Sequence, residues 1–426
     1  MSIFAVLFAA LHGLSAAASD SALAAPADAQ PEVVFEDSGA DDPERLRAER
    51  RAQAHDLDFF APYYSVEGGR DTTLFLMNTI SDPISVAVSA LADDGAELAL
   101  GSYVIESLQH VEISLRERLR GFEEDFAMGS LRLSLLGDVD TLQGWAVITE
   151  PDGQTFEIAL ITPEEATARE LVAYWDTTIP AVQGAGGAIF HLVNTSDRAI
   201  DVELVAGLGS RTNTSVLEIS PRGRARVERV GEAPLGPRGW LEIRHGGEAG
   251  DLVAVGLAGR GRHSVSLPLV PRTDTETNDR HESMPSANHH QVQGLDGAPV
   301  WLTLFNPAGE DRIVKIEALD AETGSTVGQA QLRPGSKEVL SVPLQRLIPA
   351  TRAASHGVRV RVRSEDGGVL VRGFTAQPDG TVTDLAFFSY GVHPNGTYPL
   401  PDPTRYETVT TVVNLGYKPS RIAGQV

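Results

Sequence analysis

Cysteine is absent from the 426 residues, and lysine occurs only at Lys315, Lys337 and Lys418. Without cysteine, the chain has no disulfide framework, no thiolate metal site and no cysteine nucleophile. Lys and Arg together number 35 against 58 Asp and Glu, so the formal charge is -23. Nucleic acids and anionic membranes bind basic surfaces, and we therefore expect neither as a partner.

Catalytic motifs are also missing. The sequence contains no G-x-S-x-G, H-E-x-x-H, P-loop or post-strand G-x-G-x-x-G pattern. A catalytic triad can assemble from residues far apart in the sequence, so the missing motifs are weak evidence by themselves. No His, Ser or acidic cluster recurs with the repeats described below, which is the pattern expected of a scaffold. We therefore expect a chain that is not an enzyme and uses no cofactor.

Long apolar runs are scarce, and the first begins at Ile3. It reaches Ala18 and is followed by A-x-A-like sites, a pattern typical of a secretory signal peptide at residues 1–29, although no Lys or Arg precedes it. A membrane anchor is the less favoured alternative, because the run contains His12 and Gly13 and is shorter than the roughly 20 residues that a spanning helix needs. We expect a secreted protein, extracellular or periplasmic or at the cell surface, with no membrane insertion after cleavage.

A recurring segment organises the rest of the chain. It reads TLFLMNTISDPISVAVSAL in its first copy, and its asparagine recurs at Asn78, Asn194, Asn306 and Asn414, at spacings of 116, 112 and 108 residues. One period of this length suits one β-sandwich of about 100 residues. An asparagine at a break between two strands typically bonds to the local backbone and tolerates unusual backbone angles, so we interpret it as structural rather than as a ligand contact.

Within each period the apolar residues alternate with polar ones, which predicts half-buried strands. Val86, Val88 and Ala90 are expected to face a core, and the Asp-Asp-Gly sequence ending at Gly95 predicts a hairpin turn. Helical periodicity is confined to residues 115–126, where Leu115, Leu119 and Phe122 predict one apolar face of a short helix. The fold class expected is all-β, a tandem array of antiparallel two-sheet sandwiches.

These features divide the chain into consecutive segments. After the signal peptide we expect a linker at 30–57 with a short helix at 44–54, repeat 1 at 58–164, repeat 2 at 168–271, a flexible linker at 272–285, repeat 3 at 286–389, and an incomplete fourth repeat at 390–426. A single recurring segment cannot close a sandwich. The fourth copy therefore suggests either a fragment of a longer protein or strands that pair with the third repeat or with another molecule.

Four residues are candidate ligand contacts. Trp175 is the tryptophan expected to be partly exposed, and the other three, Trp145, Trp240 and Trp301, are expected in the core rather than on a sugar-stacking platform. Arg359, Arg361 and Arg363 alternate along one strand and share a face, as do Arg222, Arg224 and Arg226 in repeat 2. Such stripes can bind acidic glycans or carboxylates, but more often they protect a strand from edge pairing.

Two groups of residues could bind a metal ion: three histidines and a set of acidic turns. His281, His289 and His290 lack a further ligand at a recognisable spacing and are interpreted as a solvated loop. Acidic turns recur between the later strands of each repeat. Calcium could bind such turns, but Asp and Gly are also common in hairpin turns, and we favour this second interpretation. The turn residues are Asp138 and Asp140, Glu248 and Asp251, and Glu365 and Asp366.

Period length and strand patterning over residues 58–389 resemble the tandem immunoglobulin-like or fibronectin-type modules of secreted bacterial surface proteins. The Cys-Trp-Cys signature of antibody-like domains is missing, so no binding residue carries over. The resemblance implies a non-enzymatic interaction, adhesion or spacer role with an extracellular protein or glycan as partner. The alternative is a glycan-binding accessory region of a larger secreted hydrolase.

Overall fold

The computed structural model describes residues 55–388, apart from short gaps. The gaps are residues 138–140, 154, 180–185, 210, 259–264, 268, 273–286, 293–298, 321–322, 354–357, 365–367, 377–381 and 386. The predicted signal peptide, the linker helix, almost all of the flexible linker and the fourth copy of the repeated segment lie outside the described residues. The described chain is all-β, as predicted, and its named sheets are antiparallel.

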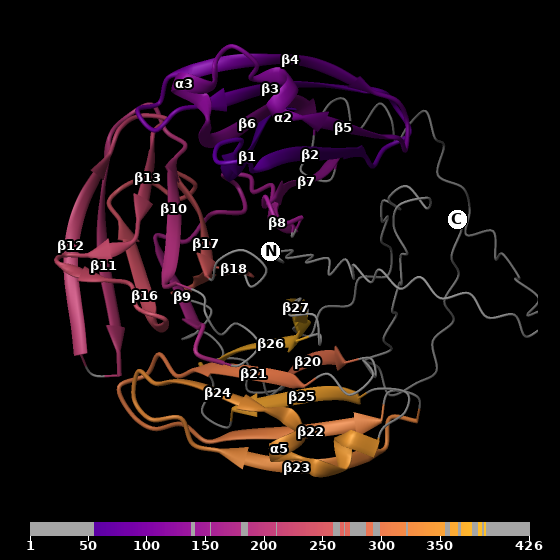
Figure 1. Cartoon of the computed structure of the whole chain (residues 1–426), viewed down its shortest axis with the longest axis vertical. Coiled ribbons are helices and arrows are strands. Elements are labelled where there is room, and N and C mark those ends of the chain that lie inside the picture. Colours follow the sequence, from indigo (N-terminus) through magenta and orange to yellow (C-terminus); the bar gives the residue numbers. More distant parts are fainter. Residues whose placement is uncertain are drawn as a thin grey trace, which may run out of the picture.

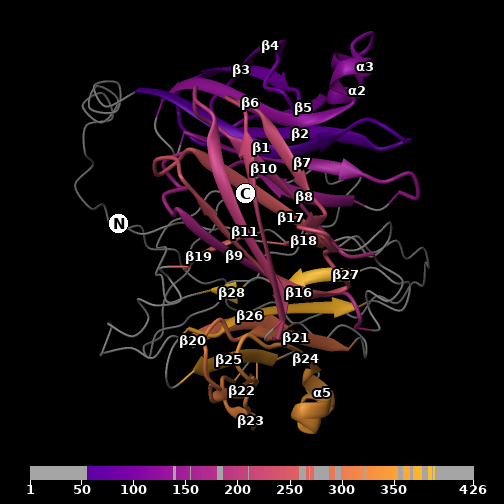
Figure 2. The same ribbon diagram turned by 90° about the vertical axis from the view of Figure 1, so that its left-hand side faces the viewer.

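Six of the sheets form three pairs along the chain. We call residues 55–161, 170–271 and 287–388 unit 1, unit 2 and unit 3. Figure 1 shows the three units following one another around an open arc, and Figure 2 shows them from the side with unit 2 between the other two. Unit 2 therefore contacts unit 1 on one side and unit 3 on the other, and we call these two contacts junctions.

Unit 1 contains eight strands in two four-stranded sheets. The first sheet has the order β1 (His55–Ser65), β6 (Met128–Gly137), β3 (Ile84–Leu91), β4 (Glu97–Ile105). The second has the order β5 (His110–Ser114), β2 (Asp71–Asn78), β7 (Leu142–Thr149), β8 (Thr155–Ala159).

Unit 2 repeats this order, with additions. Its first sheet is β12 (Arg211–Ile219), β11 (Ile200–Leu208), β16 (Arg238–His245), β9 (Glu170–Asp176), β19 (Val270–Pro271). Its second sheet is β13 (Arg224–Val227), β10 (Ala188–Asn194), β17 (Leu252–Ala258), β18 (Val265–Leu267), and a separate hairpin joins β14 (Arg229–Val230) to β15 (Ala233–Pro234).

Unit 3 has the same arrangement. Its first sheet is β23 (Thr326–Leu332), β22 (Val314–Asp320), β25 (Val358–Ser364), β20 (Ala287–Val292), β28 (Phe387–Phe388), and its second is β24 (Val339–Pro343), β21 (Val300–Phe305), β26 (Leu370–Ala376), β27 (Val382–Leu385). With the hairpin set aside, each unit pairs its first, sixth, third and fourth strands in one sheet and its fifth, second, seventh and eighth in the other. Residues at the same place in this order are called equivalent below.

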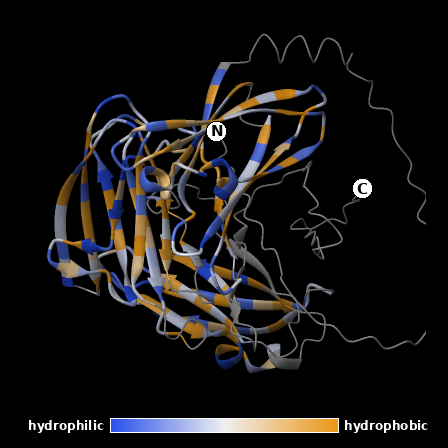
Figure 3. Ribbon diagram, turned by 45° about the horizontal axis from the view of Figure 1, so that its top comes forward, coloured by the Kyte–Doolittle hydropathy of each residue, from blue (hydrophilic) through white to orange (hydrophobic). Residues whose placement is uncertain are grey.

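Each sheet pair encloses its own hydrophobic core. In unit 1 the core joins Val86 and Val88 of β3 to Leu74 of β2 and Ile148 of β7, so both sheets contribute to it. Units 2 and 3 have cores of their own, and that of unit 2 includes the aromatic residues Trp175 and Phe190. The predicted alternation of β3 is confirmed, since Val86, Val88 and Ala90 are buried. Figure 3 shows the resulting bands of hydrophobic and hydrophilic residues along the strands.

The predicted helix at 115–126 is two short helices, α2 (Leu115–Arg118) and α3 (Glu123–Phe126). The chain bends between them at Gly121, whose φ is +89°. Leu115 and Leu119 are buried as expected, but the bend turns Phe122 outward, and it is 50% exposed. In unit 3, α5 (Leu344–Leu347) and the 3₁₀ helix η3 (Pro349–Ala353) follow the equivalent strand β24.

Candidate functional site

The recurring asparagine has a structural role, as predicted. Asn194 is fully buried, and its Nδ2 lies 2.6, 3.2 and 2.9 Å from the carbonyl oxygens of Arg198, Ile219 and Ser220, while its Oδ1 accepts from the Ser196 amide at 2.9 Å. Asn78 and Asn306 make equivalent bonds. Each asparagine thereby ties its own loop to the turn before the fifth strand of its unit.

The unusual backbone angle lies in that turn and not at the asparagine. Among the described residues, Leu108, Arg222 and Lys337 are the only ones other than glycine with a positive φ, at 56°, 57° and 52°. Each is the third residue of a turn, and the turn residues that bracket Arg222 are joined by a bond from the Gly223 amide to the Ser220 carbonyl at 2.9 Å. The asparagine therefore holds a turn that presents one side chain outward.

In units 2 and 3 this side chain reaches the preceding unit. The Arg222 guanidinium donates from Nε to Asp197 of its own unit at 2.9 Å, and its Nη1 lies 3.9 Å from the Asp58 carboxylate of unit 1. Lys337 pairs with Glu242 of unit 2, and its Nζ is 4.9 Å from the centroid of the Trp240 ring. Two contacts between units are thus built at equivalent positions, and we treat these two junctions as the candidate site.

Arg224 is the centre of the junction between units 1 and 2. Its side chain is 0% exposed, and its Nη2 lies 2.6 Å from an oxygen of Asp93 in the β3–β4 turn. Its backbone amide donates to the Asp93 carbonyl at 2.9 Å, and its Nη1 donates to the Gly129 carbonyl at 3.3 Å. The Asp93 side chain is 60% exposed, so the guanidinium alone is buried, and loss of Asp93 would leave its charge unpaired inside the junction.

An apolar layer and a histidine complete this junction. Phe60 and Leu91 of unit 1 pack against Val193 and Val253 of unit 2. The His191 ring, 3% exposed, stacks on Tyr63 of unit 1 with centroids 4.0 Å apart, and its Nδ1 is 3.1 Å from Nη1 of Arg224. Arginine can only donate, so Nδ1 accepts and the ring is neutral. Burial, with help from Arg224 and Arg226, holds the pKa of His191 well below its usual value.

The junction between units 2 and 3 uses aromatic packing. Val172, Tyr174 and Trp240 of unit 2 form one cluster with Phe305 and Val339 of unit 3. The Phe305 ring centroid lies 5.7 Å from that of Tyr174 and 6.0 Å from that of Trp240. Phe305 directly precedes Asn306, as Val193 directly precedes Asn194, so both junctions place an equivalent apolar residue against the preceding unit.

Glu242 provides the buried charge of this second junction. Besides Lys337, its carboxylate lies 3.2 Å from Nη1 of Arg272 and 3.7 Å from Nη2 of Arg244. A small cavity beside the junction is lined by residues of both units, and Arg372 of unit 3 donates there to the Ser266 carbonyl of unit 2. The lining is Tyr174, Trp175, Asp176, Thr177, Ala258, Leu267, Thr303, Arg372 and Phe374.

The prediction of which tryptophan is exposed was wrong. Trp175, expected to be partly exposed, is 3% exposed, donates from its indole to the Gly236 carbonyl at 2.8 Å and packs edge-on against Phe190. Trp175 belongs to the core of unit 2, because β9 is covered on both faces. Trp240 lies in the junction, whereas Trp145 and Trp301 are half-buried.

The two arginine stripes differ. Arg361 and Arg363 are half-buried on β25, and Arg361 pairs with Glu317 of the neighbouring strand. The Arg359 side chain lies outside what the structure describes, so ligand binding by this stripe stays a prediction. The interpretation of the other stripe as an outer face that protects a strand from edge pairing is wrong for Arg224, whose side chain is covered by unit 1.

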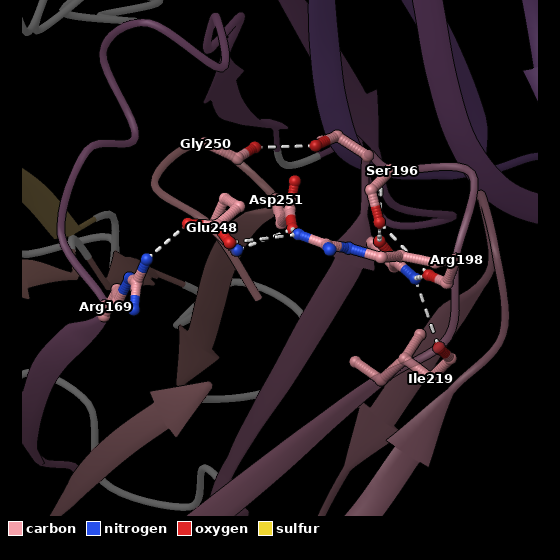
Figure 4. Close-up of polar contacts among 9 residues, drawn as sticks. Arg169, Ser196, Arg198, Ile219, Glu248, Gly250 and Asp251 are labelled. Carbon is pink, nitrogen blue, oxygen red and sulfur yellow. Dashed lines mark hydrogen bonds and ion pairs between the residues drawn. The ribbon is translucent and has the colours of Figure 1, made fainter. Parts of the chain in front are cut away.

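The acidic turn of unit 2 is occupied by arginines. Glu248 pairs with Arg169, and Asp251 lies 3.1 Å from Nη2 of Arg198 (Figure 4). The other two acidic turns, the His281 position and the side chains of His289 and His290 fall outside the described residues. In the part of the chain that is described, no three His, Asp or Glu side chains are placed to share a metal ion.

The sequence singled out Arg222, Arg224 and Arg226, but it did not show that Asp93 of unit 1 meets Arg224 across the junction or that Trp240 of unit 2 meets Lys337. It also did not show that His191 lies beside Arg224 and stacks on Tyr63 of unit 1. No known family model and no curated protein matches this chain. A search of the described helices finds none that is long and apolar enough to cross a membrane.

Proposed function

We propose that the chain is a secreted, non-enzymatic interaction or spacer protein built from three immunoglobulin-like or fibronectin-type modules, which binds a protein or glycan at the cell surface. One observation carries this proposal: the two junctions are built at equivalent positions, and each combines an apolar layer with ion pairs between the units. Modules joined by flexible linkers alone tend to move independently. Packed junctions fix the modules in an arc and hold their outer faces at set positions, as a spacer or display scaffold requires.

A panel of ester, peptide and glycoside substrates tests the non-enzymatic part. We expect no turnover by the purified chain. Turnover that a single substitution abolishes would overturn the proposal, because contaminating enzymes do not respond to a substitution in this chain.

A second candidate function, a glycan-binding accessory region of a larger secreted hydrolase, is favoured by one group of side chains. Phe75 and Trp145 stack with centroids 5.8 Å apart and planes 12° apart. Strand alternation places Glu157 of β8 on the same face of the second sheet, away from the core of unit 1. Aromatic rings with a nearby carboxylate suit stacking and hydrogen bonding to a sugar.

Retention on a panel of immobilised polysaccharides separates the two functions. If the aromatic face binds glycan, Trp145→Ala should lose retention, while Trp301→Ala, which removes a half-buried tryptophan from unit 3, should keep it. The absence of retention on every polysaccharide would reject the accessory function and leave a protein partner or a spacer role.

A further inference from the structure

The junction between units 1 and 2 contains an ionisable ring whose neutral form is part of the contact. We propose that this junction is an acid-sensitive latch: protonation of His191 releases unit 2 from unit 1, while the junction between units 2 and 3 stays closed. The proposal concerns the geometry of the array and does not depend on what the array binds.

Protonation removes the hydrogen bond that His191 now makes. Its Nδ1 accepts from Nη1 of Arg224 at 3.1 Å. Once protonated, Nδ1 is itself a donor, so two N–H groups would face each other and no hydrogen bond could form between them. One face of the ring is covered by Tyr63 of unit 1 at 4.0 Å. The ring is 3% exposed, so water cannot replace the lost bond while the junction is closed.

The charges around His191 also oppose a proton. Arg224 and Arg226 of β13 both act on the ring, and Arg226 lies directly opposite it in the β10–β13 pairing. From unit 1, Asp93 is already engaged by Arg224, and Tyr63 offers an uncharged ring. Tyr64 donates to the Phe126 carbonyl at 3.0 Å, and burial raises its pKa, so it stays neutral. A protonated His191 would therefore add a third cation to this group.

The sign of the pH dependence follows from linkage. In the closed junction the pKa of His191 is held well below its usual value, whereas separation of the units exposes the ring and restores a pKa near 6.5. The open form therefore binds the proton more tightly. Closure is at full strength above about pH 6.5 and weakens below it, by up to about tenfold per pH unit for one proton, until the pKa of the closed form is reached.

The second junction lacks this device. The residue equivalent to His191 is Thr303, three positions before its asparagine, and the residue equivalent to Arg224 is Val339, which lies opposite Phe305. Neither side chain ionises. Acid should therefore act on one junction of the array and leave the other as an internal control.

The absence of cysteine allows a labelled chain to be made directly. Val104→Cys in unit 1 with Val216→Cys in unit 2 places two dyes at positions 68% and 66% exposed. Val216→Cys with Arg333→Cys in unit 3 forms the control pair. Between pH 7.5 and 5.5, a range in which ordinary carboxylates stay charged, energy transfer should change for the first pair below about pH 6.5 and stay constant for the second. Equal changes in both pairs would overturn the proposal.

Hydrogen exchange provides a readout even if the closed form still predominates in acid. The Arg224 amide bonds across the junction to the Asp93 carbonyl at 2.9 Å, so its protection reports closure. Relative to His191→Gln at the same pH, the wild type should lose protection by up to about tenfold per pH unit below about 6.5. His191→Thr, with the residue of unit 3, serves as a second uncharged variant. Parallel protection in the wild type and both variants would show that His191 is not the latch.

Discussion

Gly95 offers a sharp test of the junction between units 1 and 2. It lies in the β3–β4 turn with φ at +91°, and a Cβ added there would be 2.2 Å from the Pro221 carbonyl oxygen of unit 2. Gly153, in the β7–β8 turn, has φ at +85°, yet a Cβ there would meet no atom within 4 Å. Gly95→Ala and Gly153→Ala therefore share the backbone penalty and differ in the contact between units.

The shared penalty is about 1–2 kcal/mol, the cost of a left-handed backbone for a residue with a Cβ. Gly95→Ala must in addition move one of the two turns until the contact exceeds 3.0 Å, the distance below which real Cβ contacts are essentially never seen. That shift strains the 2.9 Å bond from the Arg224 amide to the Asp93 carbonyl and moves Asp93 away from the buried guanidinium. A hydrogen bond to a charged group contributes about 1.5–3 kcal/mol, so Gly95→Ala should cost about 2 kcal/mol more than Gly153→Ala.

Urea unfolding followed by tryptophan fluorescence measures the two losses, and protection of the Arg224 amide against exchange reports the junction alone. We expect reduced protection in Gly95→Ala and unchanged protection in Gly153→Ala. Equal destabilisation by both variants, with equal protection of Arg224, would refute the reasoning that the close approach of the two turns constrains the junction.

Two further predictions concern single units. Asn194→Ala removes a donor that serves three carbonyls and should cost about 2–4 kcal/mol, measured by thermal unfolding, whereas Asn213→Ala on the exposed part of β12 should change stability little. Burial raises the pKa of Glu157 to about 7, so the wild type should lose stability as the pH rises from about 4.5 to 7. Glu157→Gln should not lose it, and urea midpoints that run parallel for the two proteins over this window would contradict the assignment.

The sequence is most informative about elements whose burial is local. Alternation in β3 predicted which of its side chains face the core, and the asparagine at a strand break predicted a bond to the nearby backbone. Periodicity was less informative at Phe122, because the bend at Gly121 interrupts the helix. Alternation says which side chains leave the core face of a strand. It does not say whether another unit covers them, and for this reason Arg224 and Trp240 could not be predicted as buried at a junction.

Equivalent positions in the three units reveal what no single unit shows. The third residue of the turn held by the asparagine is left-handed in every unit, and glycine would take that conformation at the least cost. Units 2 and 3 have Arg222 and Lys337 there, and each reaches a carboxylate of the preceding unit. Glycine has no side chain and could make neither contact. Unit 1 has Leu108 at this position, 59% exposed, which carries the strained backbone without the charge that forms a junction.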